Sequence, residues 1–355
     1  MSKHLRRWLW LVVCAVVVAL AFHNLSRGEE WGTFSWERVW VSLKDANFVY
    51  LLGALATTYT TYLVRAYRWR FFLDPIKKGS LWTLFVGQVL GFAAIYLLGR
   101  PGEFVRPAYI AKKEEVTFTS QAAIWLLERI YDMIFIILLF SVALALGPLR
   151  PETAHARHVI RAIRWLGLAI LLVAFLIVAV LVIFRLRAEE MREGPSRFFR
   201  FLPERWQQRM DHFLRSFVDG LEVIENWQDF FYSVASTALL WFLNTTVFWL
   251  AFHALGGDLA KLSWLAAALV LVFSILGMLA QLPGIGGGFQ VVAIGALTGF
   301  FLIKREAATA AAILLWLIIT APCVVLGLLL LVHEGLTFKR LERYAVKESP
   351  AAEKV

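Results

Sequence analysis

Charged residues and cysteines are both scarce in this chain. Only 17% of its 355 residues are charged, whereas 60% are hydrophobic. A soluble core of this size could not hide so much apolar surface, so hydrocarbon must solvate part of the chain. The two cysteines, Cys14 and Cys323, lie within apolar runs and form no CxxC pair, which argues against a disulfide framework and a zinc site. The composition predicts an all-α polytopic membrane protein.

Acidic residues are the rarer of the two charged kinds. The chain has 36 Lys and Arg against 26 Asp and Glu, a net charge of +10. Most of the excess lies in loops and tails, where positive charge favours the cytoplasmic side and attracts anionic head groups. We therefore expect a multi-pass protein of the cell (inner) membrane with both termini cytoplasmic and no nucleic-acid partner. His155 and His158 lack a third ligand, so neither a metal nor a cofactor is expected.

Apolar runs predict about six full spans. These are residues 1–22, 47–64, 121–147, 166–184, 230–255 and 309–333. The first run also fits a cleaved signal peptide, although Trp8 and Trp10 favour a retained helix. Residues 23–46 mix aromatic and charged side chains at helical spacing, so this segment is expected to lie flat at the outer interface.

Two further apolar segments are interrupted, and they occupy matching places in the two halves of the chain. Residues 99–107 read GRPGEFVRP, and residues 281–290 read QLPGIGGGFQ. After the first break only residues 104–111 are apolar, about 12 Å of helix against the roughly 30 Å that a span needs. We therefore predict two re-entrant helical hairpins. Broken segments in corresponding halves point to a transport site near the bilayer midplane.

The order of span, broken hairpin and span occurs twice, in opposite orientations, which predicts an inverted repeat. The predicted division of the chain is residues 1–46 (N-terminal membrane helix and outer interfacial helix), 47–147 (repeat 1), 148–229 (connecting span and basic amphipathic inner-leaflet segment), 230–333 (inverted repeat 2) and 334–355 (basic cytoplasmic tail).

Six charged residues fall within apolar surroundings of the first repeat: Arg100, Glu103, Arg106, Glu128, Arg129 and Asp132. A charge at the bilayer centre costs about 2.5 kcal/mol or more, so these side chains must be paired or line water. They could form internal ion pairs only, or arginines could face a hydrated cavity and hold phosphate through the guanidinium fork. Three arginines against three carboxylates leave no spare positive charge. A ligand anion would then have to compete for a pair.

The position of these residues on their helix leaves their roles open. Glu128 and Asp132 are spaced to share one helix face, whereas Arg129 points about 100° away from it. The carboxylates could hold Arg100 or Arg106 and leave Arg129 for a ligand, or the reverse.

The glycine stretch is the second candidate site. Its members are Gly284, Gly286, Gly287, Gly288 and Gln290. No Lys-Ser/Thr follows, so it is a poor nucleotide loop. Glycines would let the backbone turn within the membrane and expose N–H groups that attract anions, or the turn could merely pack. Gly295 and Gly299 form a GxxxG pattern that is expected to pack closely on a neighbouring helix.

Together, three motifs resemble the flippase-like integral membrane family related to the transmembrane region of lysylphosphatidylglycerol synthases. They are GRPGEFVR at 99–106, Glu128-Arg129 with Asp132, and LPGIGGGFQ at 282–290, and the similarity covers about residues 45–335. The resemblance implies a bundle with two re-entrant hairpins that moves an anionic or aminoacylated phospholipid, or a polyprenyl-phosphate sugar, between leaflets. Many members carry glutamate where this chain has Gln290. No aminoacyl-transferase domain is expected after His333, so lysyl-lipid synthesis is not expected.

We therefore expect a lipid translocase that works without ATP hydrolysis and is not an enzyme. Arg100, Arg106 and Arg129 would escort a phosphate-bearing head group, of a membrane phospholipid or a polyprenyl-phosphate lipid, across the bilayer. One alternative is a membrane glycosyltransferase using a polyprenyl-phosphate sugar, with Glu29 or Glu30 as base. Another is an accessory subunit that partners lipid-synthesis enzymes. Essential carboxylates in the outer loop would favour the transferase, and essential carboxylates within the membrane the translocase.

Overall fold

The structure is a computed structural model that describes residues 34–147, 227–278, 281–282 and 286–335, with isolated residues between 161 and 176. The regular secondary structure of the described residues is helical except for one pair of two-residue strands, which confirms the predicted all-α class. Four described helices are long and apolar enough to cross a membrane, or five if one bent pair is a single span. Residues 1–22 and most of 166–184 lie outside the described residues, so the count of six stays a prediction.

The described part begins with a short helix that turns sharply into a long one. α2 (Trp36–Lys44) and α3 (Phe48–Leu73) meet at an angle of 81°. Asn47 marks the bend, since its side chain accepts a hydrogen bond from the N–H of Val49 and caps α3. Trp36 and Trp40 are 68% and 67% exposed on α2. This arrangement agrees with a flat interfacial helix beside a span.

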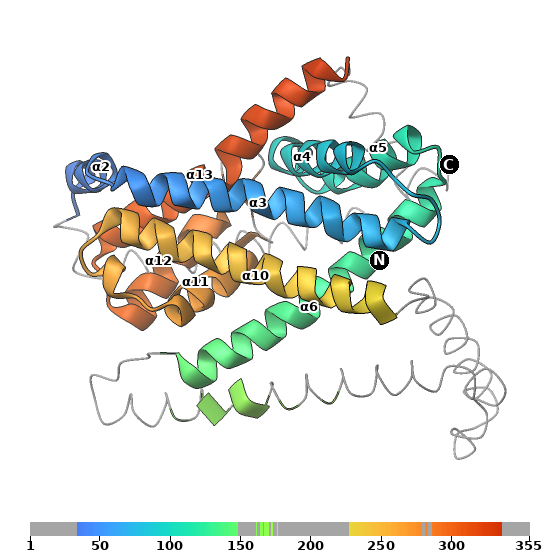
Figure 1. The fold of residues 1–355 in the computed structure, drawn as a ribbon. Coiled ribbons are helices and arrows are strands. Elements are labelled where there is room, and N and C mark those ends of the chain that lie inside the picture. Colours follow the sequence, from blue (N-terminus) through green and yellow to red (C-terminus); the bar gives the residue numbers. More distant parts are fainter. Residues whose placement is uncertain are drawn as a thin grey trace, which may run out of the picture.

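α3 runs antiparallel to α10 (Trp227–Leu255), and the two helices lie side by side (Figure 1). The N–H of Asn47 at the start of α3 donates to the carbonyl of Ala254 at the end of α10, at 2.7 Å. Near the other ends, Arg68 donates to the hydroxyl of Thr237 at 2.9 Å. The first half and the second half of the chain are therefore joined along these two helices.

α3 is longer than the sequence predicted. The predicted span ended at residue 64 because the arginines that follow resemble a cytoplasmic loop, but the helix continues to Leu73, just before Asp74 and Pro75. Proline disfavours helix in the residue before it, so the chain offers no stop signal earlier than this. The extension carries Arg65 and Arg68 into the bundle, which corrects the predicted end of the span at residue 64.

The first interrupted segment forms a helical hairpin. Its elements are α4 (Leu81–Leu98), the 3-10 helix η2 (Arg100–Phe104) and α5 (Val105–Lys113). Glycines permit the close return: a Cβ at Gly102 would lie 2.3 Å from the backbone of Ala94, and one at Gly91 would lie 2.6 Å from the Cβ of Arg106. α5 therefore packs tightly against α4.

The open end of this hairpin is closed by Glu114. Its backbone carbonyl accepts a hydrogen bond from Lys77 Nζ at 2.5 Å, and its carboxylate accepts one from the N–H of Ser80 at 3.1 Å. The residues that precede α4 and the residue that follows α5 thus lie together at one end of the molecule.

The second interrupted segment forms a matching hairpin. Its elements are α11 (Trp264–Gly277), β1 (Gln281–Leu282), β2 (Gly286–Gly287) and α12 (Gly288–Phe301), with η4 (Leu259–Lys261) before them. The two short strands pair antiparallel, and Gly287 has φ = 97°, a left-handed value that glycine allows. A Cβ at Gly277 would lie only 2.3 Å from the carbonyl oxygen of Gly288, so the helices meet closely here.

Each hairpin is followed by a long helix. These are α6 (Phe118–Leu146) after the first and α13 (Arg305–His333), which contains Pro322, after the second. Ion pairs secure both ends of α13. Arg38 of α2 lies 3.2 Å from Glu306, and Lys113 of α5 lies 2.6 Å from Glu334.

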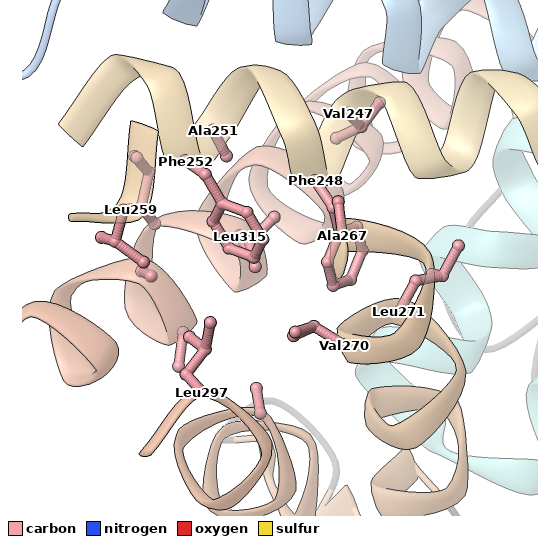
Figure 2. Packing of buried hydrophobic residues seen from close by; sticks show 14 of the residues in the cluster. Val247, Phe248, Ala251, Phe252, Leu259, Ala267, Val270, Leu271, Leu297 and Leu315 are labelled. Atoms are coloured by element: carbon pink, nitrogen blue, oxygen red, sulfur yellow. The ribbon is translucent and has the colours of Figure 1, made fainter. Parts of the chain in front are cut away.

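Two main apolar clusters fill the bundle. The larger one lies between α10, α11, α12 and α13, where Phe248, Phe252, Leu297 and Leu315 converge (Figure 2). The smaller one surrounds Trp69 of α3 and includes side chains of both α3 and α4. The GxxxG prediction is wrong in the described part of the chain, since a Cβ at either Gly295 or Gly299 would meet nothing within 4 Å.

Candidate functional site

Glu128 of α6 is the centre of a buried ionic cluster. Its side chain is 1% exposed, and one carboxylate oxygen accepts a hydrogen bond from Arg68 Nη2 at 2.5 Å. The other oxygen accepts one from Arg106 Nη2. One turn further along α6, Asp132 accepts a hydrogen bond from Arg68 Nη1 at 2.8 Å. Both carboxylates are therefore satisfied by arginines from α3 and α5, the kind of pairing that a buried charge requires.

Arg106 is held on all sides. Its Nη1 donates to Gln88 Oε1 of α4 at 2.6 Å, and its guanidinium lies 4.3 Å from the ring centroid of Trp69. Gly91 leaves room for the base of this side chain. The hairpin is thus fixed to α3 and α6 through one residue, as the structural interpretation of the sequence anticipated.

Arg68 is the member of the ionic cluster that the sequence prediction missed. Its side chain is 0% exposed, and it bridges α3, α6 and α10 through Glu128, Asp132 and Thr237. A signal was present in the sequence. Thr58, Thr61, Arg65 and Arg68 follow each other at intervals of three and four, which places them on one helix face.

Arg129 and Arg65 form looser contacts with the same carboxylates. Arg129 Nη2 lies 3.5 Å from Glu128 Oε2 and 3.9 Å from Asp132 Oδ2, and its side chain is 38% exposed. Arg65 Nη1 lies 3.8 Å from Asp132 Oδ2. Although the backbone directs Arg129 away from the carboxylate face, its long side chain reaches back toward it.

The charge balance differs from the predicted three against three. In the described part of the chain, four arginines (Arg65, Arg68, Arg106 and Arg129) contact two carboxylates, an excess of two positive charges. Since Arg68 and Arg106 hold the short hydrogen bonds, the excess falls on Arg65 and Arg129.

These two arginines line a cavity of about 240 Å³. Both hairpins contribute to its walls. Phe92 and Tyr96 come from α4, whereas Met278 and Phe289 come from the end of α11 and the start of α12. The cavity therefore lies between the two interrupted segments.

The other predicted site residues are not brought into the cluster. Glu103 is half-buried and forms no ion pair among the described residues. The side chain of Arg100, and Gly284 as a whole, lie outside the described residues. Their predicted roles therefore stay predictions.

The glycine stretch meets the cavity through Phe289. Gly286 and Gly287 form β2, Gly288 begins α12, and Gln290 Oε1 accepts a hydrogen bond from the N–H of Gly287 at 2.6 Å. Gln290 thus caps the start of α12. None of these four residues lines the cavity.

These features define a multi-pass helical membrane protein with a buried arginine–carboxylate cluster beside a cavity. The sequence profile of the lysylphosphatidylglycerol synthase TM region matches residues 7–327. The chain therefore belongs to this family, as the three motifs indicated, and it is a membrane protein of lipid-related processes. No curated protein sequence matches the chain.

Proposed function

We propose that this protein moves a lipid with an anionic, phosphate-bearing head group between membrane leaflets without hydrolysing ATP, and that it is not an enzyme. The observation that carries the proposal is the excess of two positive charges on Arg65 and Arg129 at the wall of the cavity. An anion in the cavity would neutralise a charge that the protein alone leaves unbalanced.

The chemistry of the two arginines favours phosphate. A guanidinium presents its N–H donors as a planar fork that matches phosphate oxygens bidentately. Arg129 retains free donor capacity, because its ion-pair distances of 3.5 and 3.9 Å are long and its Nε has no hydrogen-bond partner among the described residues. Phospholipids and polyprenyl-phosphate lipids share the group that these residues would bind.

The size of the cavity favours a head group over a whole lipid. Pockets that enclose drug-sized ligands measure roughly 300–1,000 Å³. At about 240 Å³ the cavity is smaller than that range, so it suits a polar head while the acyl chains remain in the surrounding lipid.

The arrangement of the helices supports a route across the membrane. α3 and α10 are antiparallel, and each is followed by a hairpin and a long helix. We read this order as an inverted-topology repeat whose hairpins enter from opposite faces, with the site at their meeting point and both termini cytoplasmic. Such repeats expose one central site to each side in turn. Glu29 and Glu30, on which the glycosyltransferase alternative rests, lie outside the described residues.

The test is leaflet exchange of fluorescent phosphatidylglycerol in ATP-free vesicles that contain the purified protein. We expect exchange faster than in protein-free vesicles, and its loss in an Arg65→Ala/Arg129→Ala double variant. Exchange at the protein-free rate with the folded wild-type protein would contradict the proposal.

A further inference from the structure

The cavity has two chemically different walls. Among the described residues, the three charged ones that line the cavity, Arg65, Arg129 and Asp132, come from α3 and α6 in the first half of the chain. The second half contributes apolar side chains and four uncharged polar ones. These are Trp241, Asn244, Trp316 and Thr320.

Three polar atoms of the second wall are buried without a hydrogen-bond partner among the described residues. They are Trp241 Nε1, Trp316 Nε1 and Thr320 Oγ1. Trp241 is 8% exposed and Thr320 is 7% exposed. Trp316 and Thr320 are four residues apart on α13, so they share a helix face, while Trp241 comes from α10. Buried polar groups in native proteins are almost always paired, so this concentration at one wall calls for a partner.

The missing partner must be an acceptor. An indole N–H can only donate, so it needs an acceptor such as a hydroxyl, ether, carbonyl or phosphate oxygen. An ammonium group supplies only donors, and Arg65 and Arg129 would repel it. Asp132 would attract an ammonium, but its carboxylate is already held by Arg68. Since the phosphate is proposed to bind Arg65 and Arg129 on the first wall, the second wall is left for an uncharged, oxygen-rich group.

We infer that the cavity takes a two-part head group: a phosphate diester against Arg65 and Arg129, and a polyol linked to it against Trp241, Trp316 and Thr320. This inference rests on the proposed function. The three polar atoms are enclosed in the structure, so their side chains turn toward the polyol when it binds. The two indole N–H groups and the Thr320 hydroxyl then donate to its oxygens. The site thereby selects polyol phosphates over phosphates that carry an ammonium group.

The test compares lipids that differ in the second part of the head group. Each vesicle preparation carries one labelled lipid. Phosphatidylglycerol and phosphatidylinositol carry a polyol on the phosphate, phosphatidylserine carries an ammonium group, and phosphatidate has a phosphate with no further group attached. We expect the two polyol lipids to exchange faster than phosphatidylserine, roughly fivefold for each hydrogen bond gained. The faster of the two shows whether the polyol is glycerol-like or ring-shaped.

Conservative variants assign the preference to the second wall. Trp241→Phe and Trp316→Phe keep the aromatic ring but remove the N–H, and Thr320→Val removes the hydroxyl at nearly constant volume. Each should lower the ratio of polyol-lipid exchange to phosphatidate exchange, both measured on the same preparation. Trp264→Phe is the matched control, because Trp264 Nε1 donates to Thr246 Oγ1 at 3.2 Å and does not line the cavity.

The outcomes separate this inference from the proposed function. Thermal unfolding in detergent with each soluble short-chain lipid provides a binding readout that needs no transport. Equal exchange and equal binding of phosphatidylglycerol and phosphatidylserine, unchanged in folded Trp241→Phe and Trp316→Phe proteins, would overturn the inference and leave translocation standing. Preferential binding of the polyol lipids without any exchange would overturn translocation and keep the two-part site. If the protein shows neither lipid exchange nor preferential binding, both the inference and the proposed function are overturned.

Discussion

Arg68 and Glu128 form an ion pair sealed from solvent, with Nη2 2.5 Å from Oε1 and side chains that are 0% and 1% exposed. Arg129, the sequence neighbour of Glu128, is 38% exposed and contacts the same carboxylate at 3.5 Å. One arginine therefore joins helices, while the other presents its charge to the cavity.

Removal of Arg68 should destabilise the fold. An Arg68→Leu variant leaves Glu128 and Asp132 with fewer partners in a buried site, and breaking such a pair typically costs about 3–5 kcal/mol. Thermal or denaturant unfolding in detergent measures this loss, and Arg68→Lys should be intermediate because it keeps the charge but not the fork. A wild-type midpoint for Arg68→Leu would show that the pair is not structural.

Lys78 and Lys113 should be accessible from the same side of the membrane. The contacts of Glu114 with Lys77 and Ser80 place the two ends of the first hairpin together. Cysteines introduced at Lys78 and Lys113, in a variant without Cys14 and Cys323, should both be labelled only from the cytoplasm. Labelling from opposite sides would replace the re-entrant hairpin with a full span.

Gly277 should tolerate no side chain. A Cβ there would lie 2.3 Å from the backbone of Gly288, so Gly277→Val should abolish folding or lipid exchange by forcing α11 and α12 apart. Gly295→Ala is the control, since a Cβ at Gly295 meets nothing within 4 Å. It should be neutral or stabilise α12 by up to about 1 kcal/mol. Wild-type exchange and stability in Gly277→Val would contradict the observed packing.

The start of α12 offers a milder test. Gln290→Leu removes the acceptor for the N–H of Gly287 and should cost about 0.5–2 kcal/mol of stability, as losses of helix caps do. Gln290→Glu keeps an acceptor and places a negative charge at a helix N-terminus, so it should retain stability. Equal loss in both variants, measured by thermal unfolding, would show that the cap is not what the residue supplies.

Glu334 should make the stability depend on acid pH. The hydrogen bond from Lys113 lowers the pKa of Glu334 below its ordinary value. A lowered carboxyl pKa gives stability that is present above the unfolded-state pKa of about 4.3 and is lost as the pH falls through the folded-state pKa. The contribution should stay below about 1 kcal/mol, because Lys113 is 45% exposed. Glu334→Gln should remove this part of the acid dependence in unfolding curves; identical curves would argue against the pair.

The sequence predicted the class, the long helices and both interrupted segments, because hydrophobic length and glycine–proline breaks are local signals. It also brought Arg106, Glu128 and Asp132 into one site. It missed Arg68, because arginines after an apolar run resemble a cytoplasmic loop, and only their helical spacing with Thr58 and Thr61 marks a buried face. The predicted charge balance of three arginines against three carboxylates was wrong partly because Arg68 had been left out. Which charged residues form ion pairs depends on which helices pack together, and no local sequence pattern contains that information.

Because Arg129 makes only loose contacts with Glu128 and Asp132, its removal tests phosphate binding directly. Leaflet exchange of labelled phosphatidylglycerol and thermal unfolding should be measured on the same reconstituted Arg129→Ala preparations. We expect loss of exchange with an unfolding midpoint close to that of the wild-type protein, and intermediate exchange for Arg129→Lys. An Arg129→Ala protein that unfolds early but exchanges lipid at the wild-type rate while folded would contradict phosphate binding by Arg129 and leave this residue with a structural role only.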